Sequence, residues 1–193
     1  MTRAGAPGGY GLVAVDKASR AGSTRTRNER TTMTSPSPIT GPLNDADQEI
    51  TGKYLQQILV DLIQLHLLAK QAHWTVVGRF FRDVHLHLDE LVTTAREYAD
   101  QVAERAATLG VPPDGRARTV AESSGLADLE ARWTTDKEAI EIVVSALGTA
   151  IGHAREAIEP LDKADPVSQD LVIEITSKLE EAHWMWQAKL ATS

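Results

Sequence analysis

The sequence predicts an all-α protein, a four-helix bundle in which one long crossover connects the second and third helices. The chain has 193 residues, of which 42% are apolar, and this is enough for one domain with a hydrophobic core. From about Asp47 onward the apolar residues recur at three- and four-residue spacing, which is the period of an amphipathic helix. Glycine and proline interrupt that pattern at a few places and leave helical stretches of about 20 to 30 residues.

The first two predicted helices are joined by a short turn. One runs from about Asp47 to Val76, and Gly78 is the natural break after it. The second runs from about Phe80 to Leu109. It ends at residues 110–113, because the two prolines there cannot continue a helix. A turn this short makes the two helices antiparallel neighbours.

The third and fourth predicted helices follow a long connection. That connection resembles a loop, although residues 126–132 could form a short helix within it. The third helix spans roughly Thr135 to Ile158 and ends at Glu159-Pro160. The fourth begins with Asp165 as its cap and Pro166 in its first turn, and it ends near Leu190. Four helices joined by short, long and short connections specify a bundle with one long crossover.

Residues 1–42 differ in composition from residues 43–193, which we expect to form the folded domain. They carry six basic and two acidic side chains, a net charge of +4, so the remainder of this −7 chain carries −11. The segment is rich in Gly, Ser, Thr and Pro and lacks apolar periodicity, which predicts a disordered basic tail. Met33 lies inside it, and translation from Met1 or from Met33 would preserve the predicted fold.

Several classes of protein are excluded by composition. The sequence has no cysteine, so disulfides, thiolate zinc sites and cysteine nucleophiles are absent, and any metal must bind through His, Asp or Glu. No apolar stretch reaches 18 residues, and the apolar run near the amino terminus is too short for a secretory signal. We therefore expect a soluble, cytoplasmic protein that does not associate with a membrane.

Groups able to bind a metal lie on one face of the second helix. At 100° per residue, four of them fall at relative angles of about 0°, 40°, 60° and 100°; they are His85, Asp89, Asp100 and Glu104. His73 ends the first helix, across the short turn from His85. Imidazole and carboxylate groups without sulfur suit iron, manganese or zinc.

These groups cannot all bind one metal within one chain. His85 and Asp89 are one turn apart, as are Asp100 and Glu104, but the two pairs are separated by 15 residues, about 22 Å along a helix. Two copies of the second helix, packed antiparallel about a twofold axis near residues 94–95, would bring unlike pairs together. The sequence therefore predicts two equivalent sites per dimer.

The same residues resemble the signature of the Dps family, the DNA-binding proteins from starved cells. The matching segments are residues 70–78, 81–91 and 100–105, and the His-x11-His-x3-Asp-x10-Asp-x3-Glu spacing is complete. The resemblance covers about Leu43 to the carboxyl terminus. It implies a ferritin-like fold and a homododecameric shell, with a di-iron or mono-iron ferroxidase centre at each half of a twofold interface.

In that family His73, His85 and Asp89 would come from one subunit, while Asp100 and Glu104 would come from its mate. The implied reaction oxidises Fe(II), preferentially with hydrogen peroxide, and stores ferric oxyhydroxide inside the shell. Consuming both reagents prevents hydroxyl-radical formation and so protects DNA from oxidative damage. The family is also DNA-binding, and the basic tail offers phosphate a salt-dependent contact, so a nucleoid-associated structural role is the second hypothesis.

The resemblance also implies roles for residues outside the five ligands. It places Trp74 against the metal site, whereas a core aromatic is the alternative reading. It places the start of the fourth helix at threefold pores, so an acidic iron path is expected through Asp165, Asp170 or Glu174. A solvated helix cap is the alternative for Asp165.

Other polar side chains have plainer interpretations. Arg105 could orient a carboxylate or form an ordinary salt bridge, and Lys70 is expected to be solvated or paired. The Glu180-x-x-His183 pair resembles the larger ferritins, but the second helix has no matching pair. The remaining histidines are expected to be structural or exposed; they are His66, His87 and His153.

Overall fold

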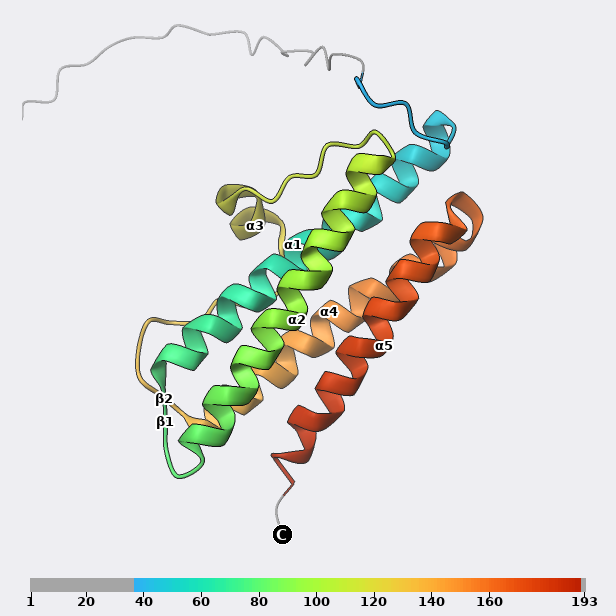
Figure 1. Ribbon diagram of the computed structural model, residues 1–193. Helices are drawn as coiled ribbons and strands as arrows, with labels where there is room; N and C mark the ends of the chain where they lie inside the picture. The colour runs from blue at the N-terminus through green and yellow to red at the C-terminus, as the bar shows by residue number, and fades with distance from the viewer. Residues whose placement is uncertain (1–36, 192–193) are drawn as a thin grey trace, which may run out of the picture. The chain divides into compact units, whose positions relative to one another are not determined.

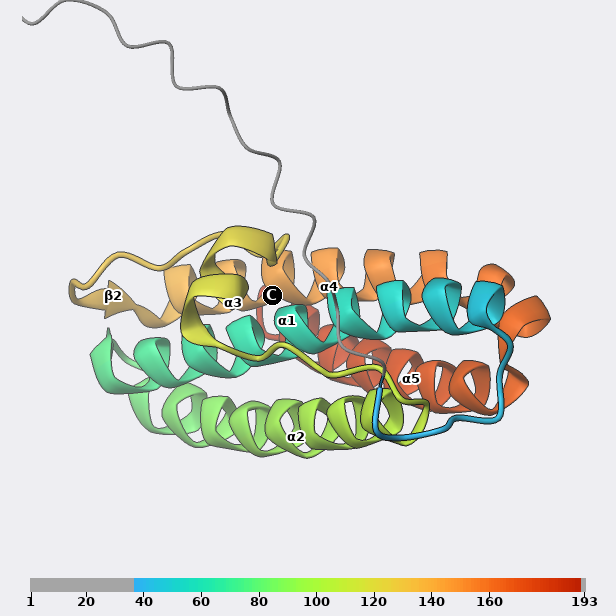
Figure 2. The same cartoon turned by 90° about the horizontal axis from the view of Figure 1, so that it is seen from above.

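The structure is a computed structural model that describes residues 37–191, and these form the expected helical bundle (Figure 1). The four long helices are α1 (Asp45–Thr75), α2 (Phe81–Thr108), α4 (Asp136–Ala164) and α5 (Pro166–Ala188). Helices α1 and α2 form one antiparallel hairpin and α4 and α5 form another, and the hairpins pack mainly through α1 and α4 (Figure 2). The predicted fold class is confirmed. Nearly all of the predicted tail lies outside the described residues, so its disorder stays a prediction.

The turn between α1 and α2 requires a glycine. Gly78 has φ +139°, a left-handed conformation that side chains rarely adopt, and a Cβ there would lie 2.5 Å from Oδ2 of Asp136. That same oxygen accepts a hydrogen bond from the backbone nitrogen of Phe80 at 2.7 Å. The first residues of α4 therefore hold the α1–α2 turn in place.

Two very short strands, β1 (Val76–Val77) and β2 (Thr134–Thr135), were not predicted. They pair in parallel, Val76 with Thr134 and Val77 with Thr135. A two-residue strand is too short to produce an alternating pattern in the sequence. The pairing fixes the end of the crossover beside the α1–α2 turn.

The prediction that the third long helix ends at Pro160 is wrong. Helix α4 continues through Pro160 to Ala164. Leu161 is fully buried and Ala164 is 6% exposed, so extending the helix places apolar side chains in the core. Proline removes one backbone donor, but this close to the helix end the loss is confined to the last turns.

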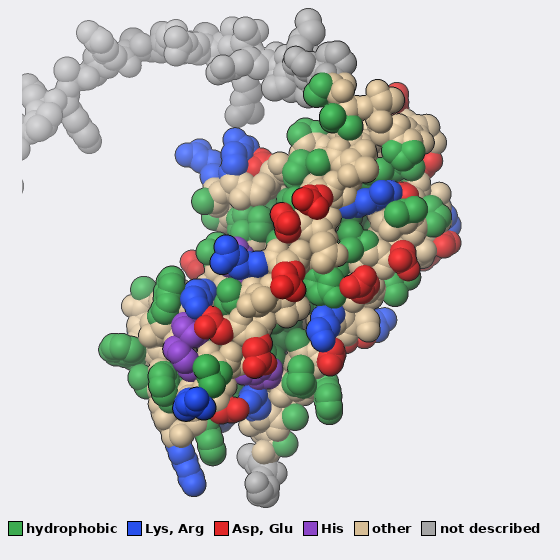
Figure 3. All heavy atoms as spheres, in the orientation of Figure 1, with side chains coloured by type: hydrophobic (Ala, Val, Ile, Leu, Met, Phe, Trp, Pro, Cys, Tyr) green, Lys and Arg blue, Asp and Glu red, His purple; other side chains and the backbone are tan. Residues whose placement is uncertain are grey.

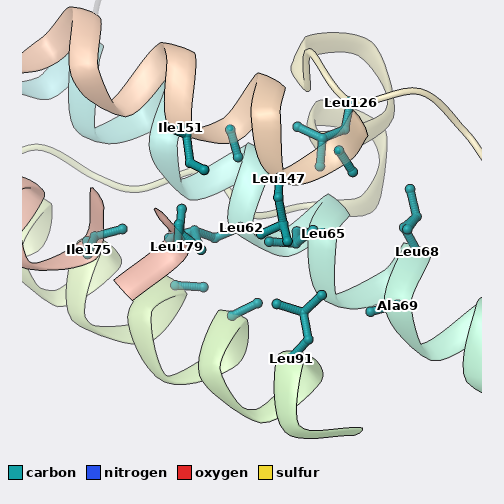
Figure 4. Packing of buried hydrophobic residues seen from close by; sticks show 14 of the residues in the cluster. Leu62, Leu65, Leu68, Ala69, Leu91, Leu126, Leu147, Ile151, Ile175 and Leu179 are labelled. Carbon is teal, nitrogen blue, oxygen red and sulfur yellow. The ribbon is translucent and has the colours of Figure 1, made fainter. Parts of the chain in front are cut away.

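The short helix within the crossover also lies elsewhere than predicted. It is α3 (Ala117–Ser123), and residues 126–132 are not helical. Leu126 instead enters the core from an irregular segment and lies above Leu147 (Figure 4). The apolar residue that suggested a helix there is therefore buried without being helical.

The core lies between the two hairpins. Leu62 and Leu65 of α1, Leu91 of α2 and Leu147 of α4 point toward one another in its centre, where Figure 4 shows them. Across the described residues, no helix combines the length and apolar character needed to cross a bilayer.

A buried carboxylate ties the crossover to this bundle. Asp61 of α1 is 2% exposed. Its Oδ1 accepts hydrogen bonds from Ser124 Oγ at 3.0 Å and from the backbone nitrogen of Gly125 at 2.9 Å. Its Oδ2 accepts from Gln57 Nε2 at 3.1 Å and from His153 Nδ1 at 2.6 Å. One side chain therefore connects α1, α4 and the segment after α3, and it gives His153 a partner that its sequence neighbours did not reveal.

We expect Asp61→Ala to lower the free energy of unfolding by about 2 to 4 kcal/mol, because donors on three segments lose the buried acceptor that they share. Chemical denaturation followed by circular dichroism measures the change. Asp162→Ala, which removes an exposed carboxylate from α4, is the matched control and should change stability little. Equal effects of the two substitutions would contradict this role.

Candidate metal centre

His73 and His85 hold each other across the α1–α2 hairpin. His73 Nδ1 lies 2.9 Å from the carbonyl oxygen of His85, and His85 Nδ1 lies 2.9 Å from the carbonyl oxygen of His73. The rings stack with their centroids 3.6 Å apart. Since a carbonyl oxygen only accepts, each Nδ1 must carry the hydrogen, and in the neutral ring each Nε2 keeps its lone pair. This is the tautomer in which a histidine binds a metal through Nε2.

Asp89 lies one turn after His85 and beside His73, and we call these three residues the candidate half-site. Its Oδ1 accepts a hydrogen bond from Lys70 and lies 3.6 Å from His73 Nδ1. The hydrogen bond from Lys70 lowers the pKa of Asp89 and outweighs the opposing effect of desolvation. Asp89 is therefore an ionised carboxylate beside two imidazoles. His73 is 8% exposed whereas the side chain of Asp89 is 46% exposed, so the half-site opens toward the surface.

The other two predicted ligands lie elsewhere on α2. Asp100 and Glu104 are exposed, and neither contacts His73 or His85. In residues 37–191, no three metal-binding side chains converge closely enough to enclose an ion by themselves. The structure thus places His73, His85 and Asp89 at one end of the α1–α2 hairpin, while Asp100 and Glu104 lie further along α2.

A groove between α1, α2 and the crossover borders the half-site. It has a volume of about 930 Å³, and its wall includes Lys70, Trp74, Asp89 and the crossover residue Leu129. Trp74 is 64% exposed, so its interpretation as a core aromatic is wrong. Figure 3 shows histidine side chains reaching the surface toward the end of the molecule where α1 and α2 are joined.

Asp165 does not belong with the exposed acids proposed for an iron path. It is 4% exposed, and its Oδ2 accepts hydrogen bonds from Arg105 at 2.6 Å and from Ser168. Desolvation opposes its ionisation, but the hydrogen bonds from Ser168 and Arg105 prevail and lower the pKa of Asp165. Arg105 therefore forms a salt bridge that anchors α2 to the α4–α5 corner, and Asp165 is removed from the predicted pore set.

Asp170 and Glu174 keep the exposure that an iron path needs. Both are exposed on α5 and line a surface hollow of about 570 Å³ together with Tyr98. The hydroxyl of Tyr98 donates to Glu174 Oε1 at 3.2 Å.

The remaining histidines are packed against the bundle. Burial lowers the pKa of His66 and of His87, and the ring of His87 stacks on Trp186 with the centroids 4.3 Å apart. On α5, Glu180 accepts a hydrogen bond from Arg155. That salt bridge occupies the carboxylate of the Glu-x-x-His pair.

Comparison with known proteins defines the class of this fold. The family described as the ferritin-like domain matches residues 52–192, so the chain is a ferritin-like protein. Within that class it belongs to the Dps family, as its motif predicted. It is 34% identical over 155 residues to the DNA protection during starvation protein of Mycolicibacterium smegmatis, covering 78% of this chain and 82% of that protein.

Solved structures agree with this assignment. Mycobacterium smegmatis Dps superimposes with a TM-score of 0.77 at 34% identity, covering 83% of this chain and 96% of that one. Dps from Microbacterium arborescens in its high iron form gives a TM-score of 0.75 at 33% identity, covering 80% and 99%. The fold is therefore shared over the whole helical domain.

We expect Arg105→Met to destabilise the protein by about 3 kcal/mol near neutral pH, because it leaves the carboxylate of Asp165 buried without its cation. Since the salt bridge lowers the pKa of Asp165 in the folded protein, its stabilisation is present at neutral pH and is lost as the pH falls through that pKa. The difference in free energy of unfolding between Arg105→Met and the unmodified protein should therefore become smaller at low pH. Urea denaturation at pH 7 and at a series of pH values below about 4, the ordinary pKa of an aspartate, measures the change.

Arg155→Met is the matched control, since Arg155 pairs with Glu180 on the surface and its side chain is 62% exposed. The Arg155→Met substitution should lower the free energy of unfolding only slightly at any pH. A pH-independent deficit in Arg105→Met would show that packing of the arginine stem, and not its charge, is what matters.

Proposed function

We propose that this protein is a ferroxidase subunit that oxidises Fe(II) and stores the ferric product inside a shell of identical subunits. The reciprocal hydrogen bonds of His73 and His85 beside Asp89 carry the proposal. In neutral rings they leave a lone pair on each Nε2, near the carboxylate of Asp89, whose side chain is 46% exposed, and this suits a site that takes up ferrous ions from solution. Family membership supports the same chemistry.

In this proposal the second half of each site comes from another subunit. Asp100 and Glu104 share the face of α2 that carries His85 and Asp89, but they lie about 22 Å further along it. An antiparallel twofold contact between two α2 helices unites unlike halves and creates two equivalent sites. The acidic half supplies oxygen ligands, which suit the ferric product, while the histidine half supplies nitrogen ligands that suit ferrous iron.

Hydrogen peroxide is the proposed oxidant. Two Fe(II) ions give one electron each to one peroxide, whose O–O bond breaks. With two further waters the products are two FeO(OH) units and four protons, so atoms and charge balance. Both ingredients of hydroxyl-radical chemistry are consumed together. Asp170 and Glu174 are the proposed acids along the path by which iron enters the shell.

We also propose that the full shell has twelve subunits and works in the cytoplasm, in contact with the nucleoid. Six basic side chains in residues 1–42 give each subunit a cationic segment, in contrast to its acidic body. Many copies on one shell would bind phosphate with high avidity and without sequence preference. The relative from Mycolicibacterium smegmatis is named for DNA protection, which fits this second activity.

Subunit mixing tests the split site. Shells of His85→Ala/Asp89→Ala subunits and shells of Asp100→Ala/Glu104→Ala subunits should each lose fast Fe(II) oxidation, because every site lacks half of its ligands. After dissociation and reassembly together, each mixed dimer contains one intact site, so part of the activity should return. Absorbance of the ferric product after addition of peroxide follows the rate.

The same mixture before subunit exchange is the control and should remain inactive. If all ligands served one centre within a subunit, every subunit would still be damaged and mixing would restore nothing. If a monomer oxidised Fe(II) at the full rate, the proposal that each site is shared between two subunits would also be contradicted.

Deletion of residues 1–42 tests the DNA contact. We expect weaker DNA retention and a flatter dependence on salt, because fewer phosphates are neutralised, while the rate of iron oxidation stays the same. Electrophoretic mobility over a series of salt concentrations measures both effects. Equal retention with and without the segment would assign DNA binding to another surface or to none.

A further inference from the structure

We propose that Lys70 is a displaceable cation that occupies the carboxylate of Asp89 until a metal ion arrives, and so sets how tightly the half-site binds Fe(II). The inference rests on the proposed function, since it assigns a role to a residue beside the proposed ligands. Lys70 is here a positioning and affinity-determining residue, and it is not itself a metal ligand, because an ammonium has no lone pair.

The contact is placed where a metal would compete with it. Lys70 lies on α1, one turn before His73, and its Nζ donates to Oδ1 of Asp89. The same oxygen lies 3.6 Å from His73, whose ring stacks on that of His85. The ammonium therefore bonds the carboxylate oxygen that lies beside His73.

A divalent ion and the ammonium cannot both sit there without repulsion. Two like charges a few ångströms apart repel strongly wherever water is partly excluded, and the repulsion doubles when one of them is divalent. The metal must therefore push Lys70 away from Asp89, or bind more weakly. Because each cation lowers the affinity for the other, the hydrogen bond of Lys70 and metal binding are in direct competition.

The groove beside the half-site has room for the Lys70 side chain once it leaves Asp89. Lys70 is 32% exposed, and it lines the groove of about 930 Å³ on the crossover side of the half-site. Glu90 and Asp128 line the same groove, and both are exposed acids able to receive the ammonium. A flexible four-carbon stem can move between these positions at small cost in strain.

The same cation has a purpose when no metal is bound. In the proposed dimer each centre gathers the carboxylates of Asp89 and of the partner's Asp100 and Glu104. Three like charges meeting in one interface repel one another, and unpaired buried charge is costly. One ammonium per centre reduces that excess, so the interface can form before iron is loaded.

Zinc provides a probe that binds without redox chemistry. We expect Lys70→Met, which keeps the length of the stem and removes the charge, to bind Zn²⁺ about tenfold more tightly than the unmodified shell in calorimetric titration. Lys70→Arg, which keeps the charge, should not gain affinity. Lys163→Met, which removes an exposed lysine paired with Glu159 on α4, should match the unmodified protein. A gain in affinity is a result that structural damage does not produce.

Equal or weaker Zn²⁺ binding by Lys70→Met would overturn the inference, provided that the unmodified shell binds Zn²⁺ and His85→Ala weakens that binding. If the unmodified shell shows no binding that depends on His85, the proposed function itself fails, so the two failures are distinguishable.

A second measurement uses the unmodified protein and does not depend on whether a variant assembles. Acetylation by a small anhydride, read by mass spectrometry, should modify Lys70 faster when Zn²⁺ is bound, since the ammonium is released from Asp89. Lys163 serves as the internal reference. Unchanged or slower modification of Lys70 with Zn²⁺ would contradict displacement.

Discussion

The proposed metal centre depends on the two hydrogen bonds that His73 and His85 make to each other's backbone. Each ring is oriented by the residue opposite, so the position of one imidazole is defined by the helix that carries the other. Both hydrogen bonds can form only if α1 and α2 are aligned so that His73 and His85 lie opposite each other. Gly78, the side chain of Asp136 and the β1–β2 pair all act on that turn. The crossover and α4 thereby stabilise the proposed centre, to which they contribute no proposed ligand.

Three aspartates show how their surroundings give chemically identical carboxylates different roles. Asp61 receives four hydrogen bonds and is closed to any further ligand. Asp165 is buried with Arg105 and Ser168 and anchors the α4–α5 corner. The side chain of Asp89 is 46% exposed, and the ammonium of Lys70 lies beside it. Of the three, only Asp89 combines ionisation with access, which is what a metal ligand requires.

Much of this arrangement could be predicted from the sequence, because it depends on the helical period of the apolar residues and on the spacing of the polar ones. The four long helices, the break at Gly78 and the separation of His85/Asp89 from Asp100/Glu104 all follow from positions along the chain. What could not be read depends on contacts between distant segments. The pairing of Asp61 with His153 spans 92 residues, and Arg105 meets Asp165 across 60. Pro160 within α4 was missed for the same reason, since burial of Leu161 outweighs the local signal.

The spacing along α2 also limits how electrons can be delivered. In the proposed dimer the two centres lie at opposite ends of a pair of helices, about 22 Å apart. An oxidant bound at one centre is therefore too distant to touch iron at the other. Since a peroxide needs two electrons and each Fe(II) supplies one, the second ion must reach the same centre, either beside the first or after it. The kinetic order in iron at low loading is thus a property of each centre alone, whatever the size of the shell.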